Sequence, residues 1–229
     1  MPTAVASFDV EDVKRCGDVI RALGKGAGSM EAAAQRVAEY LYGELEGAAL
    51  VRLYKTHPFG GLPPDLRAFV GQPVEADVRC LTLLGTAGDA DAWNDRRRSR
   101  DHQAIPLPSE EVVEQLPMVM QLITQLGIDV SHVIRPEPQV VRELSQRTYD
   151  VFHVADAASS PHVPAKDFVR DHGIRSALGF GGMLYTGDFY AVVLFSKVSI
   201  SADTAQMLKI LSLPVRVPLL ANLRRVFSG

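Results

Sequence analysis

The sequence predicts one α/β (α+β) domain built on a mainly antiparallel sheet, with helices packed on its faces. Three observations lead to this prediction: helical periodicity at both ends of the chain, several short apolar runs typical of strands, and a tight hairpin connection near the C-terminus. The strands do not alternate regularly with helices, so parallel nucleotide-binding folds are disfavoured. With 229 residues, 47% of them hydrophobic, the chain can bury a full core.

The N-terminal part is predicted to be helical. Apolar residues recur every three or four positions over residues 10–23, and the glycines that follow end this helix. Ser29 is a suitable N-cap for a second helix, whose apolar face runs to Leu45. We expect residues 1–28 to form a helical extension and residues 29–229 to form the main domain.

Strands are predicted in the next part of the chain. The runs 48–54 (AALVRLY) and 78–84 (VRCLTLL) are typical of strands, with a short helix over 64–70 between them. The small and acidic residues of 85–91 predict an exposed loop, which continues into a strongly polar segment. A short strand is expected at 104–107.

The second half begins with a predicted helix over 109–126, capped by Ser109 and followed by Gly127. Prolines interrupt the next stretch, which leaves a helical turn from Gln139 and a strand over 149–154.

A hairpin and a helix complete the predicted order. The apolar runs 174–184 and 189–198 are joined by a short connection and should pair in antiparallel fashion. Ser201 then opens a long helix, which Pro214 and Pro218 are expected to kink.

Charge and composition exclude several classes of partner. Lys and Arg number 24 against 27 Asp and Glu, and a net charge of −3 gives no general attraction to nucleic acid or to an anionic membrane. No apolar run approaches the roughly 18–20 residues that cross a bilayer, and the first residues lack a signal-peptide core. We therefore expect a cytoplasmic protein without a nucleic-acid or membrane partner.

Several segments resemble GAF-like sensory domains of the kind found beside bacterial histidine kinases. In the C-terminal half these are 152–156 (FHVAD), 174–182 (IRSALGFGG) and 186–197 (TGDFYAVVLFSK). Residues 93–96 (WNDR), followed by His102 and 105–107 (IPL), look like the middle of the same group. The resemblance covers roughly residues 47–220.

This resemblance implies a GAF-like central antiparallel sheet of about six strands. The N- and C-terminal helices would pack on one face, and loops plus a helix would cover the other. It also implies a ligand pocket roofed by loops and a homodimer formed through the terminal helices.

The resemblance does not identify a ligand, so the cofactor stays unknown. Bilin-binding members need a suitably placed cysteine, and neither Cys16 nor Cys80 lies in the segments that would roof the pocket. The NKFDE signature of cyclic-nucleotide binding and the cysteine set of the sulfoxide-reducing members are not found. No metal site is predicted either, because the six histidines have no helical i,i+4 pair.

The polar segment 93–103 is the candidate ligand-binding loop. It combines an indole, an amide, four arginines and a histidine, which suit an anionic or planar ligand, although a solvated loop is the alternative interpretation. A ligand would enter between the sheet and the loops 93–103 and 153–173. Trp93 would stack on it, the arginines would pair with acid groups and the others would hydrogen-bond. The candidate residues are Trp93, Asn94, Arg97, His102, His153 and Arg175.

The sequence favours a signalling function without catalysis. There is no G-x-S-x-G elbow and no phosphate-binding loop, so we predict no catalytic residues. The expected function is to bind a small ligand and relay it through helix-mediated contacts to a histidine kinase or response regulator of a two-component system. One alternative is a ligand-free GAF-like interaction or dimerisation module. Another is an enzyme with a strongly shifted carboxyl or histidine in a cleft.

Overall fold

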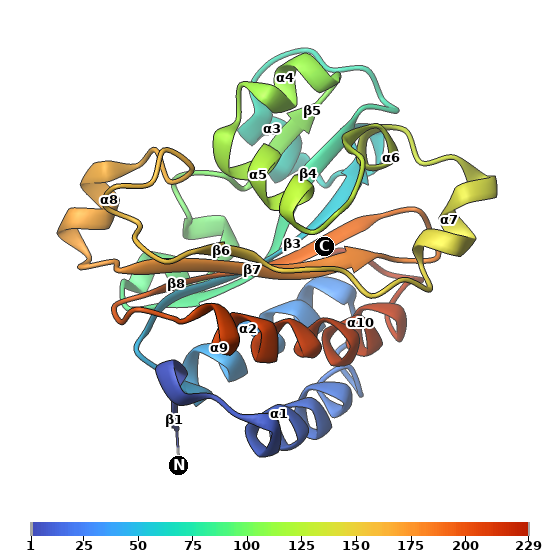
Figure 1. Ribbon diagram of the computed structural model, residues 1–229. Helices are drawn as coiled ribbons and strands as arrows, with labels where there is room; N and C mark the ends of the chain where they lie inside the picture. The colour runs from blue at the N-terminus through green and yellow to red at the C-terminus, as the bar shows by residue number, and fades with distance from the viewer. Residues whose placement is uncertain (1, 229) are drawn as a thin grey trace.

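A six-stranded antiparallel sheet forms the centre of the computed structural model, which describes residues 2–228 (Figure 1). The strand order is β5-β4-β3-β8-β7-β6, which confirms the predicted sheet of about six antiparallel strands. Residues 1 and 229, the end points of the predicted extension and main domain, lie outside the described residues. The strands are β3 (Ala48–Pro58), β4 (Arg79–Gly88), β5 (Ala104–Leu107), β6 (Phe152–Val154), β7 (Ser176–Met183) and β8 (Phe189–Ser196). A separate parallel pair is formed by β1 (Thr3–Ala4) and β2 (Leu45–Glu46).

The N- and C-terminal helices cover one face of the sheet, as predicted (Figure 1). They are α1 (Val10–Ala22), α2 (Met30–Glu44), α9 (Ala202–Leu208) and α10 (Ser212–Leu220). Helix α10 contacts both α1 and α2. Their apolar side chains enclose a core with Val51, Leu53 and Val192 of the sheet. Helix α1 thus shares this core, and a domain boundary at residue 28 stays a prediction.

Shorter helices and loops cover the opposite face (Figure 1). These helices are α4 (Glu110–Glu114), α5 (Pro117–Gln125), α6 (Val130–Ile134), α7 (Pro138–Leu144) and α8 (Lys166–Asp171). Helix α3 (Pro64–Val70) packs beside β5. A second apolar core lies here, with Leu122 and Ile123 of α5 packed against Leu83, Phe152 and Val193 of the sheet.

The prediction of one continuous helix over 109–126 was wrong, because two helices separated by a break occupy this stretch. Helix α4 ends at Glu114 and α5 begins at Pro117. Proline has no N–H to continue the helical hydrogen bonds, and its ring disfavours helical backbone at the preceding residue, Leu116. The short helices α6 and α8 were not predicted, and the last helix is divided by a 3-10 turn at Lys209–Leu211.

Strand β4 is longer than predicted and includes part of the expected loop over 85–91. It continues to Gly88 because Gly85 and Gly88 serve close packing. A Cβ added at Gly85 would lie 2.4 Å from the carbonyl oxygen of Ala34 in α2. A side chain there would push the helix off the sheet. Strand β6 is shorter than predicted, beginning at Phe152.

Candidate functional site

Arg52 is a charged residue in the middle of β3, and its guanidinium is almost fully buried. The residue is 9% exposed, and it pairs across the sheet with Val193 of β8 in the core under α5. Its Nη1 donates to the hydroxyl of Tyr54 (3.2 Å) and its Nη2 donates to the hydroxyl of Ser99 (3.0 Å). Among residues 2–228, its buried Nε has no hydrogen-bond partner. The positive charge is therefore held by neutral hydroxyls, which is a costly arrangement in a protein interior.

Thr86 of β4 lies opposite Arg52 in the antiparallel register. Directly opposed residues of paired strands project from the same face of a sheet. The hydroxyl of Thr86 is also buried, and it has no hydrogen-bond partner in the described part of the chain. Buried polar side-chain atoms are nearly always paired in native proteins. Two neighbouring exceptions on one sheet face make Arg52 and Thr86 the candidate binding residues.

The loop between β4 and β5 closes over Arg52. Ser99, 2% exposed, follows the 3-10 turn η4 (Arg96–Arg98), and its carbonyl accepts a 2.6 Å hydrogen bond from Gln103 Nε2. His102 has a left-handed backbone with φ of 61°, a conformation that costs a non-glycine residue about 1–2 kcal/mol. Desolvation and the positive charge of Arg52 lower the pKa of His102. The same charge would attract an anion.

Four aromatic rings lie beside this position, and we call them the aromatic group: Trp93, Phe168, His172 and Phe195. The Trp93 ring lies 4.4 Å from the ring of His172 and 5.6 Å from that of Phe168, measured between centroids. Trp93 also covers Gly88, which lies two residues along β4 from Thr86. Two residues of a strand span about 7 Å, so the aromatic group and Arg52 are neighbours on the sheet.

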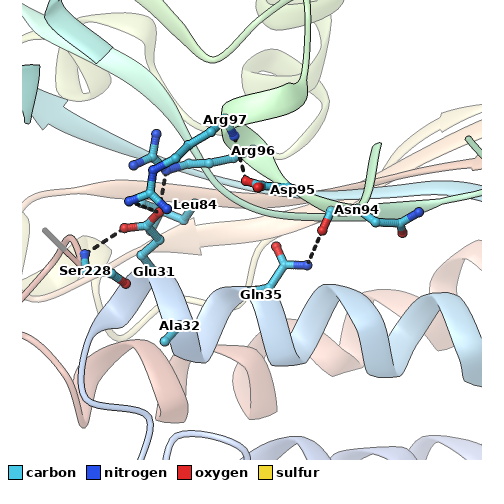
Figure 2. A pocket seen from close by; sticks show the side chains of 9 residues that line it. All are labelled: Glu31, Ala32, Gln35, Leu84, Asn94, Asp95, Arg96, Arg97 and Ser228. Carbon is cyan, nitrogen blue, oxygen red and sulfur yellow. Dashed lines mark hydrogen bonds and ion pairs between the residues drawn. The ribbon is translucent and has the colours of Figure 1, made fainter. Parts of the chain in front are cut away.

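The six residues predicted from sequence lie in four different surroundings. Trp93 belongs to the aromatic group and His102 lies near Arg52. Asn94 and Arg97 line a shallow hollow at the start of α2, together with Glu31 (Figure 2). The Asn94 side chain pairs with both the N–H and the carbonyl of Gly88, so it fixes the loop.

The last two predicted residues lie on other parts of the sheet. The Nε2 atom of His153, in β6, is 2.8 Å from the carbonyl oxygen of Ile200. Arg175 is exposed just before β7, and its backbone pairs with Ser196 and Ala157. The structure therefore brings Trp93 and His102 towards one place on the sheet, while Arg97 lies on the α2 side of the loop.

Sequence reasoning missed Arg52, Thr86 and Ser99 as site residues. One signal was available for Arg52, because it is the single charged residue in the apolar run 48–54. A charge in the middle of a strand buried on both faces needs a partner. No local pattern singled out Thr86 or Ser99.

A second buried charge cluster lies at the other end of β3. Lys55, 2% exposed, pairs with Asp188 at 2.9 Å, and Arg79 pairs with the same carboxylate. Burial alone would raise the pKa of Asp188, but Lys55 and Arg79 hold it below its usual value. Burial and the charge of Lys55 lower the pKa of His57 to about 4. Lys55 also donates to the carbonyl of Thr56, so this cluster is internally satisfied.

Within residues 2–228, no group of three or more His, Cys, Asp or Glu side chains is placed to hold a metal ion. The same part of the chain contains no helix with the length and apolar character of a membrane span.

Comparison with known proteins finds similarity only among solved structures. No protein-family model and no curated protein matches the chain. One similar structure is the phycocyanobilin-bound GAF domain from a cyanobacterial phytochrome, with 12% identity, a TM-score of 0.49, and coverage of 93% of this chain and 96% of that chain. Another is the phycoerythrobilin-bound GAF domain from a cyanobacterial phytochrome, with 11% identity, a TM-score of 0.45, and coverage of 92% and 95%.

The chromophore-binding domain of an unusual bacteriophytochrome from R. palustris is also similar, with 8% identity and a TM-score of 0.43. That match covers 90% of this chain and 61% of the other. Two of these three structures are GAF domains, the class that the sequence resemblance named. With identities and TM-scores this low, we take neither ligand nor function from them.

Proposed function

We propose that this chain is a non-catalytic sensory domain that binds a small planar carboxylate against the sheet at Arg52. The observation that carries the proposal is the buried guanidinium, which within residues 2–228 has two hydroxyl partners and no partner for Nε. A carboxylate suits this position because its two oxygens accept from two N–H groups of one guanidinium. Thr86 would supply a further hydroxyl donor or acceptor to the same ligand.

The neighbouring aromatic group supports a planar ligand. Trp93, Phe168 and Phe195 supply flat apolar surface, with Trp93 over Gly88 of β4 and Phe195 opposite Leu50 of β3, each two residues along its strand from Thr86 or Arg52. Aromatic side chains favour offset or edge contacts with other rings. A ring on the ligand would therefore join this group while its acid reaches the guanidinium.

Thermal unfolding with and without a probe tests the proposal. The probes are benzoate, phenyl phosphate and benzyl alcohol, which share the ring and differ in the polar group. With a Kd of about 1 mM, about 10 mM benzoate would stabilise the folded state by about 1.4 kcal/mol. For a chain of this size that free energy raises Tm by about 3–6 °C. We expect the rise with benzoate and none with benzyl alcohol.

Two matched variants locate the effect. Arg52→Met removes the guanidinium while keeping a long apolar stem, and it should abolish the rise with benzoate. Arg97→Met makes the same change on the α2 side of the loop and should retain it. A rise that survives in Arg52→Met, or one seen with phenyl phosphate alone, would overturn the carboxylate assignment. Loss of the rise in Arg97→Met would favour the site predicted from sequence.

A second candidate function is assembly through the C-terminal helices. Ile210, Leu213 and Val217 are 45%, 39% and 43% exposed and follow helical spacing, so they form one apolar stripe. A homodimer would bury this stripe. Native mass spectrometry of the wild type and of Leu213→Glu tests it. A dimer that is lost in the variant supports assembly, and a monomeric wild type excludes it at the concentration used.

The output partner in this proposal is a histidine kinase or a response regulator. Its support is the resemblance of residues 152–197 to domains found beside such kinases. Co-purification of each partner class with the wild type, with and without benzoate, would test the assignment.

A further inference from the structure

The last described residues, 225–228, lie against the start of α2, and we call them the C-terminal segment. The backbone N–H of Met30 donates to the carbonyl of Arg225, and that of Glu31 donates to the carbonyl of Val226, both at 2.8 Å. The first N–H groups of a helix have no partner inside the helix. The C-terminal segment supplies the missing acceptors, so it is held at the helix start by main-chain hydrogen bonds.

Glu31 connects the C-terminal segment to the β4–β5 loop (Figure 2). One carboxylate oxygen accepts from the backbone N–H of Ser228 at 2.7 Å, and the other accepts from Nε of Arg96 at 2.6 Å. Both charged side chains are buried, Glu31 at 6% exposure and Arg96 at 3%. Arg96 also pairs with Asp65 at 2.8 Å. A buried ion pair of this kind is sensitive to displacement, because a lost partner leaves a charge unpaired.

Arg96 begins the 3-10 turn η4 and Ser99 directly follows it. The backbone N–H of Ser99 donates to the carbonyl of Arg96 at 3.2 Å, which closes the turn. At one end, the Ser99 hydroxyl accepts from Arg52. At the other end, Arg96 pairs with Glu31. The turn is therefore in contact with the candidate ligand site and with the group that holds the C-terminal segment.

We propose that occupation of the Arg52 site releases the C-terminal segment through this turn. The inference rests on the proposed function, and it names residues 225–228 as the output of the sensor. A carboxylate that accepts from Nη2 of Arg52 competes with the Ser99 hydroxyl. Once Arg52 releases the Ser99 hydroxyl, which still donates to the carbonyl of Asp101 at 3.0 Å, the turn shifts and Arg96 leaves Glu31, which weakens the hold on Ser228. Such coupling requires that the ligand bind the two arrangements of the turn with different affinity.

Amide hydrogen exchange of the full chain tests this coupling without any ligand. Ser99→Ala removes the acceptor of Arg52, together with the donor to the Asp101 carbonyl, and should raise the exchange rate of the Ser228 and Met30 amides at least threefold. Arg52→Met removes the donor of the same hydrogen bond and should have the same effect, which provides a second route if one variant fails to fold. Amides in β6, at the opposite edge of the sheet from the β4–β5 loop, should keep their rates.

Ser176→Ala is the matched control. It deletes a serine hydroxyl that donates to the carbonyl of Val198 at 2.8 Å, away from the turn. A Ser228 rate that is unchanged in Ser99→Ala, or that rises equally in Ser176→Ala, would overturn the coupling. A uniform rise over all amides of Ser99→Ala would also overturn it, because that pattern reports general loss of stability.

Failure of the coupling and failure of the ligand proposal give different results. If benzoate stabilises the wild type through Arg52 but leaves the Ser228 exchange rate unchanged, binding stands and the coupling is overturned. If benzoate has no effect but Ser99→Ala releases residues 225–228, the coupling stands and the carboxylate assignment is overturned.

Discussion

Replacing His57 with asparagine should remove part of the pH dependence of folding. In the folded state burial and the charge of Lys55 hold the pKa of His57 at about 4, with Asp188 opposing and Arg79 reinforcing this shift. In the unfolded chain the imidazole has its ordinary pKa of 6.5. Between these values the unfolded state binds more protons than the folded state. The stability that the neutral ring contributes is complete above pH 6.5 and is lost as the pH falls to about 4.

The size of the effect follows from these two pKa values. Each unit of difference between the folded-state and unfolded-state pKa changes the free energy of unfolding by about 1.4 kcal/mol, so the full difference changes it by about 3 kcal/mol. That is a large share of the roughly 5–15 kcal/mol by which domains are stable. The free energy of unfolding should decline through this window and level off below it.

Urea unfolding of the wild type and His57→Asn at several pH values measures this difference. Asparagine keeps a polar acceptor near Lys55, whose Nζ lies 3.4 Å from Nδ1 of His57, and it has no group that titrates here. The pKa of His102 is also lowered, but that residue is present in both proteins and cancels. The gap between the two stability curves should change by about 3 kcal/mol across the window. Parallel curves would refute the argument that His57 is neutral because it is buried beside Lys55.

Two further substitutions test the packing around the sheet. Asp188→Asn leaves the cations Lys55 and Arg79 without their carboxylate and should lower the free energy of unfolding by about 3–5 kcal/mol. The control Asp77→Asn changes an exposed carboxylate and should alter that free energy little. Equal losses of the two variants in urea unfolding would contradict the prediction. Gly85→Ala would place a Cβ 2.4 Å from a backbone oxygen of α2 and should destabilise by at least about 1–3 kcal/mol. Gly43→Ala is the control, because its Cβ would meet open space, and it should leave the free energy of unfolding unchanged or raise it by up to about 1 kcal/mol. A Gly85→Ala protein as stable as the wild type would refute the close contact between the sheet and α2.

The sequence by itself determined the elements whose causes are local. Ser29 caps α2 as predicted, and Asp9, a local cap that the periodicity alone did not point to, caps α1. The two apolar runs near the C-terminus pair as the predicted hairpin, β7 with β8. Such patterns depend on neighbours within a few positions, so they can be recognised along the chain.

Tertiary structure decided how far some of these elements extend. The glycines of 85–91 are locally typical of a loop, yet Gly85 belongs to a strand because α2 passes over it. The helix predicted over 109–126 is the opposite case, since Pro117 is a local signal that the apolar periodicity concealed. A periodic pattern shows which face is buried, and it does not show where the backbone is broken.

Only the tertiary structure decided which polar residues form the candidate site. Arg52 meets Ser99 across 47 positions of sequence, and Glu31 meets Ser228 across 197. The loop 93–103 was recognised from its composition, but its side chains lie in different surroundings. Trp93 belongs to the aromatic group, and Arg97 lies beside α2. Composition specifies which charges a segment carries. The direction each side chain takes, and whether a buried charge finds its partner, depends on residues that only folding brings together.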